Sequence, residues 1–260
     1  MPRYQLVKMH VPERANPKVL REAPAAAAWM PLDISAALNG DLRTIFKQRY
    51  TSPRPDRVSM RVAYDGWGAW TFARFWGIAT PEIGMEKVLG PEAAAGLIQD
   101  GQLVTPQHAR FRAPDPNSNI AFTSLWDKWP KQVTVPVNHM GEAVWLLVSG
   151  STTPMQGKIA NAVVRLKYVD GQQESLDLVP PENFWSLCKF GNVDYNYERD
   201  GFSLPKEPPP MVQLGTNCRA MVYGWKLRPG VVLKEITLEA LSQDVVIGLM
   251  AASVMNPGTP

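Results

Sequence analysis

Short alternations of apolar and polar residues dominate the second half of this chain, and they constrain its fold more than any other feature. Val164, Leu166 and Tyr168 fall on one side of an extended segment. Arg165 and Lys167 fall on the other side. The same period of two recurs in three further groups: Val133, Val135 and Val137; Met221, Tyr223, Trp225 and Leu227; Ile236, Leu238 and Ala240. Because successive side chains of a β-strand point to opposite faces of a sheet, each group predicts a strand with one buried face.

Turn residues and denser apolar runs complete this pattern. Asp170 and Gly171 follow the strand predicted at 161–169, and this pair readily supplies positive φ in a two-residue hairpin turn. We therefore expect the next alternating segment, with Leu176 and Leu178, to return antiparallel. Ala143–Val148 and Val245–Ala251 are apolar almost throughout, which is typical of central strands covered on both faces.

The proline and glycine residues between the predicted strands indicate the fold class. The chain has 24 prolines in 260 residues, a share of about 9% and roughly twice the usual one. Many short strands separated by proline and glycine predict an all-β fold, an antiparallel β-sandwich of the jelly-roll or galactose-binding-like kind. Helical spacing is visible only at Asp41–Arg49 and, more weakly, at Pro91–Gln99, so a parallel α/β fold is disfavoured.

We predict one folded domain from this pattern. Residues 1–28 are polar and interrupted by proline, which favours an extended lead-in or linker. Residues 29–256 would form the single β-sandwich domain. Residues 77–117 contain few alternating segments and several glycine and proline breaks, so we expect a long irregular insertion there.

Composition and charge exclude several classes of protein. With 45% hydrophobic and 20% charged residues, the chain is expected to be globular rather than disordered. Its longest apolar stretch, Val245–Met255, is far shorter than the roughly 20 residues of a membrane-spanning helix. The net charge is +3, and the basic residues of the first 60 positions are scattered, so we expect no nucleic-acid partner. The N-terminal segment has no apolar core, so we expect no signal peptide in this chain.

Sequence motifs for cofactors, metals and serine nucleophiles are missing. There is no glycine-rich phosphate loop, no dinucleotide fingerprint and no Gly-x-Ser-x-Gly elbow. His10, His108 and His139 are too far apart to suggest a zinc site, so we expect no metal and no cofactor, although calcium sites built from loops leave little trace. Cys188 and Cys218 could form a disulfide in an exported protein, and two free, buried thiols are the simpler interpretation.

Five tryptophans in turn-like contexts carry the main functional signal. They are Trp67, Trp70, Trp126, Trp129 and Trp185. An indole ring in a loop can stack on the apolar face of a sugar while a nearby carboxylate or amide binds its hydroxyl groups. Asp127, Asn183 and Asn161 are the partners expected for this role. The alternative is that each tryptophan closes an end of the sandwich and bonds its N–H to a loop carbonyl.

Loop carboxylates provide a second hypothesis. Glycoside hydrolases use two carboxyl groups about 5–9 Å apart. Asp194 and Asp200, with Asp127, are candidates for such acid–base groups. A solvated acidic loop explains the same residues without catalysis.

Three stretches of the chain resemble a known family. They are Tyr50–Pro55, following a segment with Leu32, Asp33 and Ile34; Asn119–Asp127, running on to Leu146–Gln156; and Asp244–Ala251. Together they resemble the C-terminal β-sandwich region of a family of large, uncharacterised bacterial glycoside-hydrolase-like proteins. The resemblance covers about residues 30–255. It implies a carbohydrate-related role and a secreted or periplasmic location.

Three functions are therefore open. The first is a carbohydrate-binding or accessory β-sandwich of a bacterial polysaccharide-degrading system, with an oligosaccharide or polysaccharide as partner. The second is a glycoside hydrolase using the loop carboxylates. The third is a structural or oligomerisation module, in which the apolar strands at Ala143–Val148 and Val245–Met250 and the proline-rich lead-in dock a catalytic chain or further copies of this one.

Overall fold

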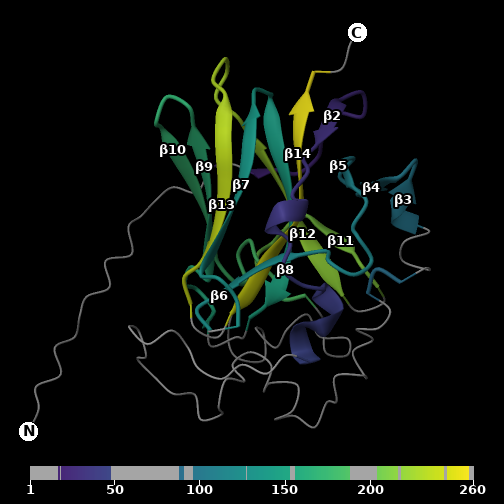
Figure 1. Cartoon of the computed structure of the whole chain (residues 1–260), viewed down its shortest axis with the longest axis vertical. Helices are drawn as coiled ribbons and strands as arrows, with labels where there is room; N and C mark the ends of the chain where they lie inside the picture. Colours follow the sequence, from purple (N-terminus) through teal and green to yellow (C-terminus); the bar gives the residue numbers. More distant parts are fainter. Residues whose placement is uncertain are drawn as a thin grey trace, which may run out of the picture.

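The computed structural model describes residue 17 and residues 19–47, 88–90, 96–126, 128–152, 156–187, 204–215, 218–242 and 245–257. Within these ranges the chain is an all-β structure of antiparallel sheets (Figure 1). Its larger sheet combines β1 (Val19–Leu20), β2 (Ala28–Pro31), β6 (Ala121–Ser124), β8 (Ala143–Ser151), β11 (Met211–Gln213), β12 (Arg219–Lys226) and β14 (Val246–Asn256). Its second sheet has the order β10 (Gln173–Leu178), β9 (Ala162–Tyr168), β13 (Leu233–Ala240), β7 (Gln132–His139).

The two sheets pack face to face, as the alternation predicts. Val164, Leu166 and Tyr168 of β9 lie in one buried cluster with Met221, Tyr223 and Trp225 of β12. The cluster also takes in the apolar positions of β7, β10 and β13. Arg165, on the opposite face of β9, pairs instead with Glu239 of β13. The predicted antiparallel β-sandwich is therefore confirmed.

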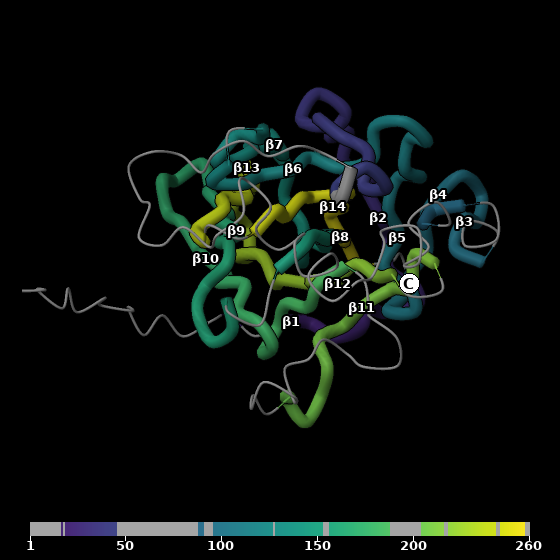
Figure 2. The backbone as a smooth tube through the Cα atoms, turned by 90° about the horizontal axis from the view of Figure 1, so that it is seen from below, coloured from purple at the N-terminus to yellow at the C-terminus, as the bar shows by residue number. Residues whose placement is uncertain are grey.

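A second core covers the outer face of the larger sheet, so this sheet is buried on both sides. Every residue of β8 is buried, which confirms the central strand predicted from Ala143–Val148. The cover includes a small sheet of β3 (Ile98–Gln99), β4 (Gln102–Val104) and β5 (Arg110–Arg112), which lies within the predicted insertion. Figure 2 shows this small sheet and the β7–β13–β9–β10 sheet on opposite sides of the larger one.

Two strands of the larger sheet change partners along their length. β12 pairs with β8 on one side and with both β1 and β11 on the other. β14 pairs with β8 on one side, and on the other with β6 at Val246–Leu249 and with β2 at Ser253–Asn256. β1 belongs to this sheet although it falls in the predicted lead-in.

Three local predictions need correction. The helix expected at Asp41–Arg49 is a short 3-10 helix, η2 (Leu42–Lys47), and Asn119 Oδ1 accepts a hydrogen bond from the Leu42 backbone N–H at its start. Within the helix expected at Pro91–Gln99, residues 98–99 are strand β3. The β9–β10 turn has one residue more than expected, because Tyr168 bonds to Gln172 and only Gly171 takes positive φ.

Candidate functional site

Three of the tryptophans expected to bind sugar are buried. Trp126 and Trp129 belong to the core on the outer face of the larger sheet, with 6% and 7% of their surface exposed. Trp185 lies in the core between the sheets, where its indole N–H donates to the Pro181 carbonyl 2.7 Å away. The Arg219 guanidinium lies over its ring, 4.8 Å from the centroid. None of the three rings presents an open face on which a sugar could stack.

The two asparagines expected as hydroxyl partners hold loops together. Asn161 is fully buried, and its Oδ1 accepts a hydrogen bond from the Thr152 hydroxyl while its amide donates to the Gln156 carbonyl. Asn183 accepts from the Val179 backbone N–H and donates to the Asp177 carbonyl. These bonds use the amide groups that a saccharide would need.

The remaining candidates lie outside the described residues. They are Trp67, Trp70, Asp127, Asp194 and Asp200. Cys188 also lies outside, but Cys218 is disulfide-bonded and Cys188 is the only other cysteine of the chain. The interpretation as two free thiols is therefore wrong for Cys218.

The structure places a pocket where strand β14 changes neighbours. Neither β6 nor β2 pairs with β14 between Leu249 and Ser253. At the same point the register of β14 against β8 shifts between Leu249 and Ala251, which is a β-bulge. The bulge turns two consecutive side chains, Met250 and Ala251, toward the outer face of the sheet, where both line the pocket. Bulges often re-aim side chains beside functional sites in this way.

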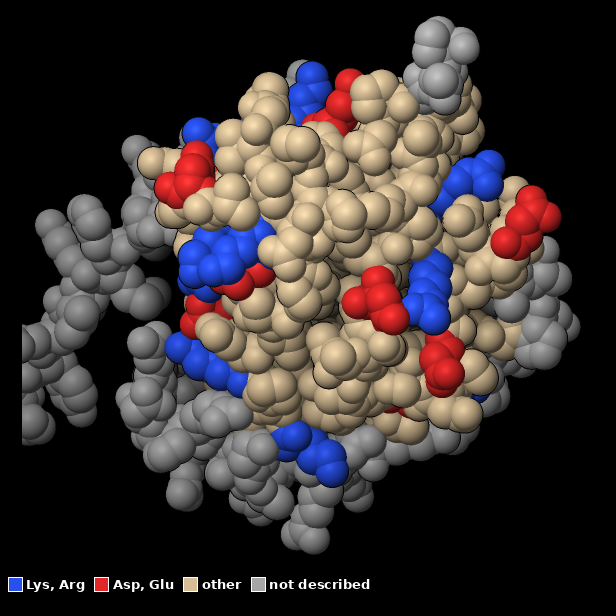
Figure 3. Space-filling view, turned by 45° about the horizontal axis from the view of Figure 1, so that its top comes forward, with Lys and Arg blue, Asp and Glu red and all other residues tan. Residues whose placement is uncertain are grey.

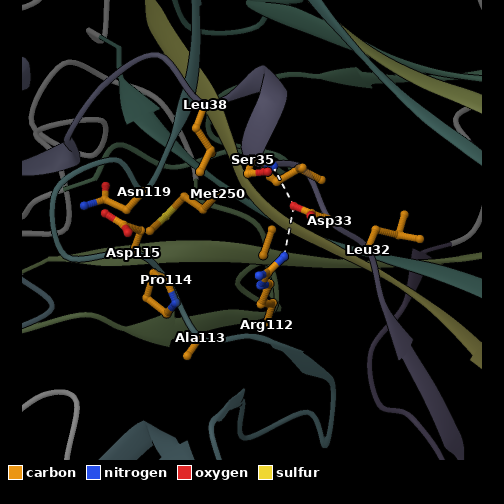
Figure 4. A pocket seen from close by; sticks show the side chains of 12 residues that line it. Leu32, Asp33, Ser35, Leu38, Arg112, Ala113, Pro114, Asp115, Asn119 and Met250 are labelled. Atoms are coloured by element: carbon orange, nitrogen blue, oxygen red, sulfur yellow. Dashed lines mark hydrogen bonds and ion pairs between the residues drawn. The ribbon is translucent and has the colours of Figure 1, made fainter.

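The pocket, here called the β14 pocket, has a volume of about 280 Å³ and combines apolar and polar walls. Figure 4 shows Met250 between two polar walls, with Leu38 on one side of it and Pro114 on another. One wall carries Asp33, Ser35 and Arg112, and the other carries Asp115 and Asn119. Such an apolar surface with a few convergent polar groups is typical of small-molecule sites.

Asp33 and Arg112 form an ion pair on one wall of the pocket. The Arg112 Nη1 atom lies 2.9 Å from Asp33 Oδ1, and about 63% of each side chain is exposed. Hydrogen bonds from the Ser35 side chain and backbone, together with the Arg112 guanidinium, lower the pKa of Asp33 to about 2. At Asp115, the backbone N–H groups of Asn117 and Ser118 donate to Oδ1 and lower the carboxyl pKa. Both carboxyl groups are therefore ionised at neutral pH.

A smaller hollow of about 140 Å³ adjoins the β14 pocket across the segment 113–116. The apolar part of its lining includes Leu97, Ile98 and Leu103, and its charged groups are Arg43 and Asp115, which it shares with the β14 pocket. The Arg43 guanidinium pairs with both oxygens of Asp41 and also donates to the Pro116 carbonyl. Burial alone would raise the pKa of Asp41, but hydrogen bonds from Arg43 and Asn119 lower it. These bonds hold the segment between the two hollows in place.

No protein-family model, curated protein or solved structure matches this chain.

Sequence reasoning missed the polar residues of the β14 pocket. Asp33, Asn119 and Met250 do fall in or beside the three stretches that carry the family resemblance. The other signal is the turn sequence Asp115–Ser118, in which an aspartate side chain commonly bonds the backbone two residues on. Nothing in the spacing of these segments shows that β2, β5 and β14 meet.

Three further features of the described residues complete this description. No three His, Cys, Asp or Glu side chains in them are arranged to hold a metal ion. Helices long and apolar enough to cross a membrane are missing from the same ranges. On the face shown in Figure 3, Lys, Arg, Asp and Glu side chains are scattered over a largely uncharged surface and form no large patch of one sign.

Proposed function

We propose that this chain binds carbohydrate through the β14 pocket, as an accessory β-sandwich of a bacterial polysaccharide-degrading system. The observation that carries the proposal is the pocket itself, in which Asp33, Arg112 and Asp115 surround an apolar floor at Met250. Carboxylates accept hydrogen bonds from sugar hydroxyl groups, and a guanidinium group donates hydrogen bonds to the oxygen atoms of the sugar. Apolar side chains can contact the C–H faces of a sugar ring. The resemblance noted from the sequence supports the polysaccharide-degrading context.

The charge state of the pocket favours binding over hydrolysis. A glycoside hydrolase needs one protonated carboxyl group with a raised pKa beside an ionised one. The pKa values of Asp33 and Asp115 are both lowered, the first by Ser35 and Arg112 and the second by backbone N–H groups. The pocket therefore supplies two hydrogen-bond acceptors and no general acid. The hydrolase hypothesis based on Asp127, Asp194 and Asp200 stays a prediction about residues outside the described ranges.

The oligomerisation hypothesis rests on the apolar strands at Ala143–Val148 and Val245–Met250 and on the proline-rich lead-in. The structure bears on the two strands. Both are buried inside the chain, where β8 and β14 pair with each other and pack against a core on each face. They therefore offer no apolar surface for docking.

The disulfide bond of Cys218 is consistent with an exported protein. Disulfides form and persist mainly in secreted and periplasmic proteins, because the cytosol keeps thiols reduced. The disulfide bond of Cys218 thus supports the secreted or periplasmic location that the resemblance implies.

Binding of a glycan panel to the wild type and to an Asp33→Ala/Arg112→Ala variant tests the proposal. We expect the wild type to bind at least one oligosaccharide and the variant to bind it at least tenfold more weakly, because both polar groups of one wall are lost. Isothermal titration calorimetry measures the affinities, and circular dichroism checks that the variant is folded.

The matched control is Asp170→Ala/Arg228→Ala. This pair has a similar arrangement at the β9–β10 turn: Asp170 Oδ1 accepts from the backbone N–H of Gln172 and Oδ2 lies 2.6 Å from Arg228 Nη1. The β9–β10 turn lies well away from β5 (Figure 1). Unchanged binding by the Asp33/Arg112 variant, or equal losses in both variants, would contradict the proposal.

A further inference from the structure

We infer that the β14 pocket selects saccharides that carry no carboxylate or sulfate group. The inference rests on the proposed function and adds the class of ligand. Its basis is the charge of the pocket lining: two carboxylates, Asp33 and Asp115, face one guanidinium, Arg112. Two negative charges against one positive charge leave a net charge of −1.

The single positive charge in the lining is already compensated. The Arg112 guanidinium is paired with Asp33 at 2.9 Å, so an incoming anion would have to compete with a fixed carboxylate. Arg43 in the adjoining hollow is compensated in the same way, because its Nε atom lies 3.0 Å from each oxygen of Asp41. Asp41 lines neither hollow, but it cancels the charge of Arg43. With Asp41 counted, the groups in and beside the two hollows are three carboxylates and two guanidinium groups, with a net charge of −1.

Hydrogen-bond chemistry leads to the same conclusion. Asp115 uses Oδ1 to accept from the backbone N–H groups of Asn117 and Ser118. Among the described residues no donor contacts its Oδ2 atom, so this oxygen can accept from a ligand. A sugar hydroxyl can donate there, whereas an ionised carboxylate only accepts. A uronic acid placed against this wall would bring two acceptors together without a proton between them.

The expected selectivity is moderate because the groups are exposed. A unit charge about 5 Å from another through water changes a binding constant roughly fourfold, and partial exclusion of water increases this factor. Screening by salt reduces it, since the Debye length falls from about 10 Å at 0.1 M to about 3 Å at 1 M. We therefore expect acidic oligosaccharides to bind at least about fourfold more weakly than neutral ones at low salt, and this gap to shrink as salt is added.

Calorimetric titration with matched neutral and acidic oligosaccharides tests the inference. The neutral probes are cellohexaose, mannohexaose and xylohexaose, and the acidic probes are hexagalacturonate and hexamannuronate. Asp115→Asn is the informative variant, because an asparagine Oδ1 still accepts from the backbone of the turn while the negative charge is removed. We expect this variant to reduce the difference in affinity between neutral and acidic probes. Asp33→Asn should reduce this difference further, because it leaves Arg112 without its counter-charge.

Asp170→Asn is the matched control, since it removes an equivalent exposed carboxylate from the β9–β10 turn and should leave the gap unchanged. Acidic probes that bind the wild type as tightly as neutral ones would overturn the inference and leave the proposed function standing. An affinity difference that neither Asp115→Asn nor Asp33→Asn changes would also overturn the inference. If no probe of either kind binds the wild type, the proposed function itself fails.

Discussion

At the scale of single residues, Trp129 shows how aromatic packing stabilises the core on the outer face of the larger sheet. Its indole ring packs against the Phe122 ring of β6, with centroids 4.8 Å apart and planes inclined by 42°. Both side chains lie in the core that covers the outer face of the larger sheet. Contact between aromatic rings at this distance adds to the free energy gained by burying their apolar surface. Trp129 is therefore expected to act through stability.

Replacing this ring gives a direct test of that role. We expect Trp129→Ala to lower the free energy of unfolding by about 3–5 kcal/mol, because it leaves a cavity against Phe122. Urea denaturation followed by circular dichroism measures the change, and Lys128→Ala, at the exposed neighbouring position, is the control. A variant of unchanged stability that no longer binds glycan would instead assign Trp129 to the ligand.

At the scale of secondary structure elements, the approach of β12 to β8 depends on a glycine. Gly224 pairs with Trp145, and the Trp145 ring lies directly over it. A Cβ atom at position 224 would lie 2.6–2.7 Å from three atoms of that ring. Trp145 is fully buried and also contacts Trp29 of β2 edge to face, with centroids 6.0 Å apart, so it has little room to move.

We predict that Gly224→Ala destabilises the chain by about 1–3 kcal/mol, the usual cost of adding a methyl group to a packed core. Gly96→Ala is the matched control, because no atom lies within 4 Å of the added Cβ there. Thermal unfolding of the two variants beside the wild type gives the comparison. Equal melting temperatures for all three proteins would show that Trp145 does not pack against Gly224 as described.

The same scale shows which features could be predicted from the sequence. Alternation is a local property, so the strands and their buried faces could be derived for Val164, Leu166 and Tyr168 without any knowledge of their partners. The bulge at Met250 could not, because β14 is apolar at nearly every position and a slip of one residue leaves no trace in such a pattern. Asp170 and Gly171 marked the hairpin, yet the loop length depended on how Tyr168 pairs with Gln172.

At the scale of the whole molecule, the candidate site depends on contacts between distant parts of the chain. Asp33 follows β2, Arg112 ends β5 and Met250 sits in β14, so the pocket forms only when these strands come together. The Ser253 hydroxyl helps to join two of them by donating to the Arg110 carbonyl, 2.6 Å away. Tryptophans are conspicuous in a sequence, but their burial depends on the same long-range packing. For this reason the sequence pointed to Trp126 and Trp129 while the structure points to the β14 pocket.

The disulfide stabilises the whole folded chain by restricting its unfolded state. Cys218 is buried and disulfide-bonded, and Cys188 lies thirty residues earlier in the sequence. Closing a loop of this length restricts the unfolded chain, so we expect Cys218→Ala to lower the free energy of unfolding by roughly 2–4 kcal/mol. Protein made in an oxidising compartment should show no reactive thiol when unfolded without reductant, and two after reduction. Two thiols titrating before reduction would contradict both the bond and the exported setting that it supports.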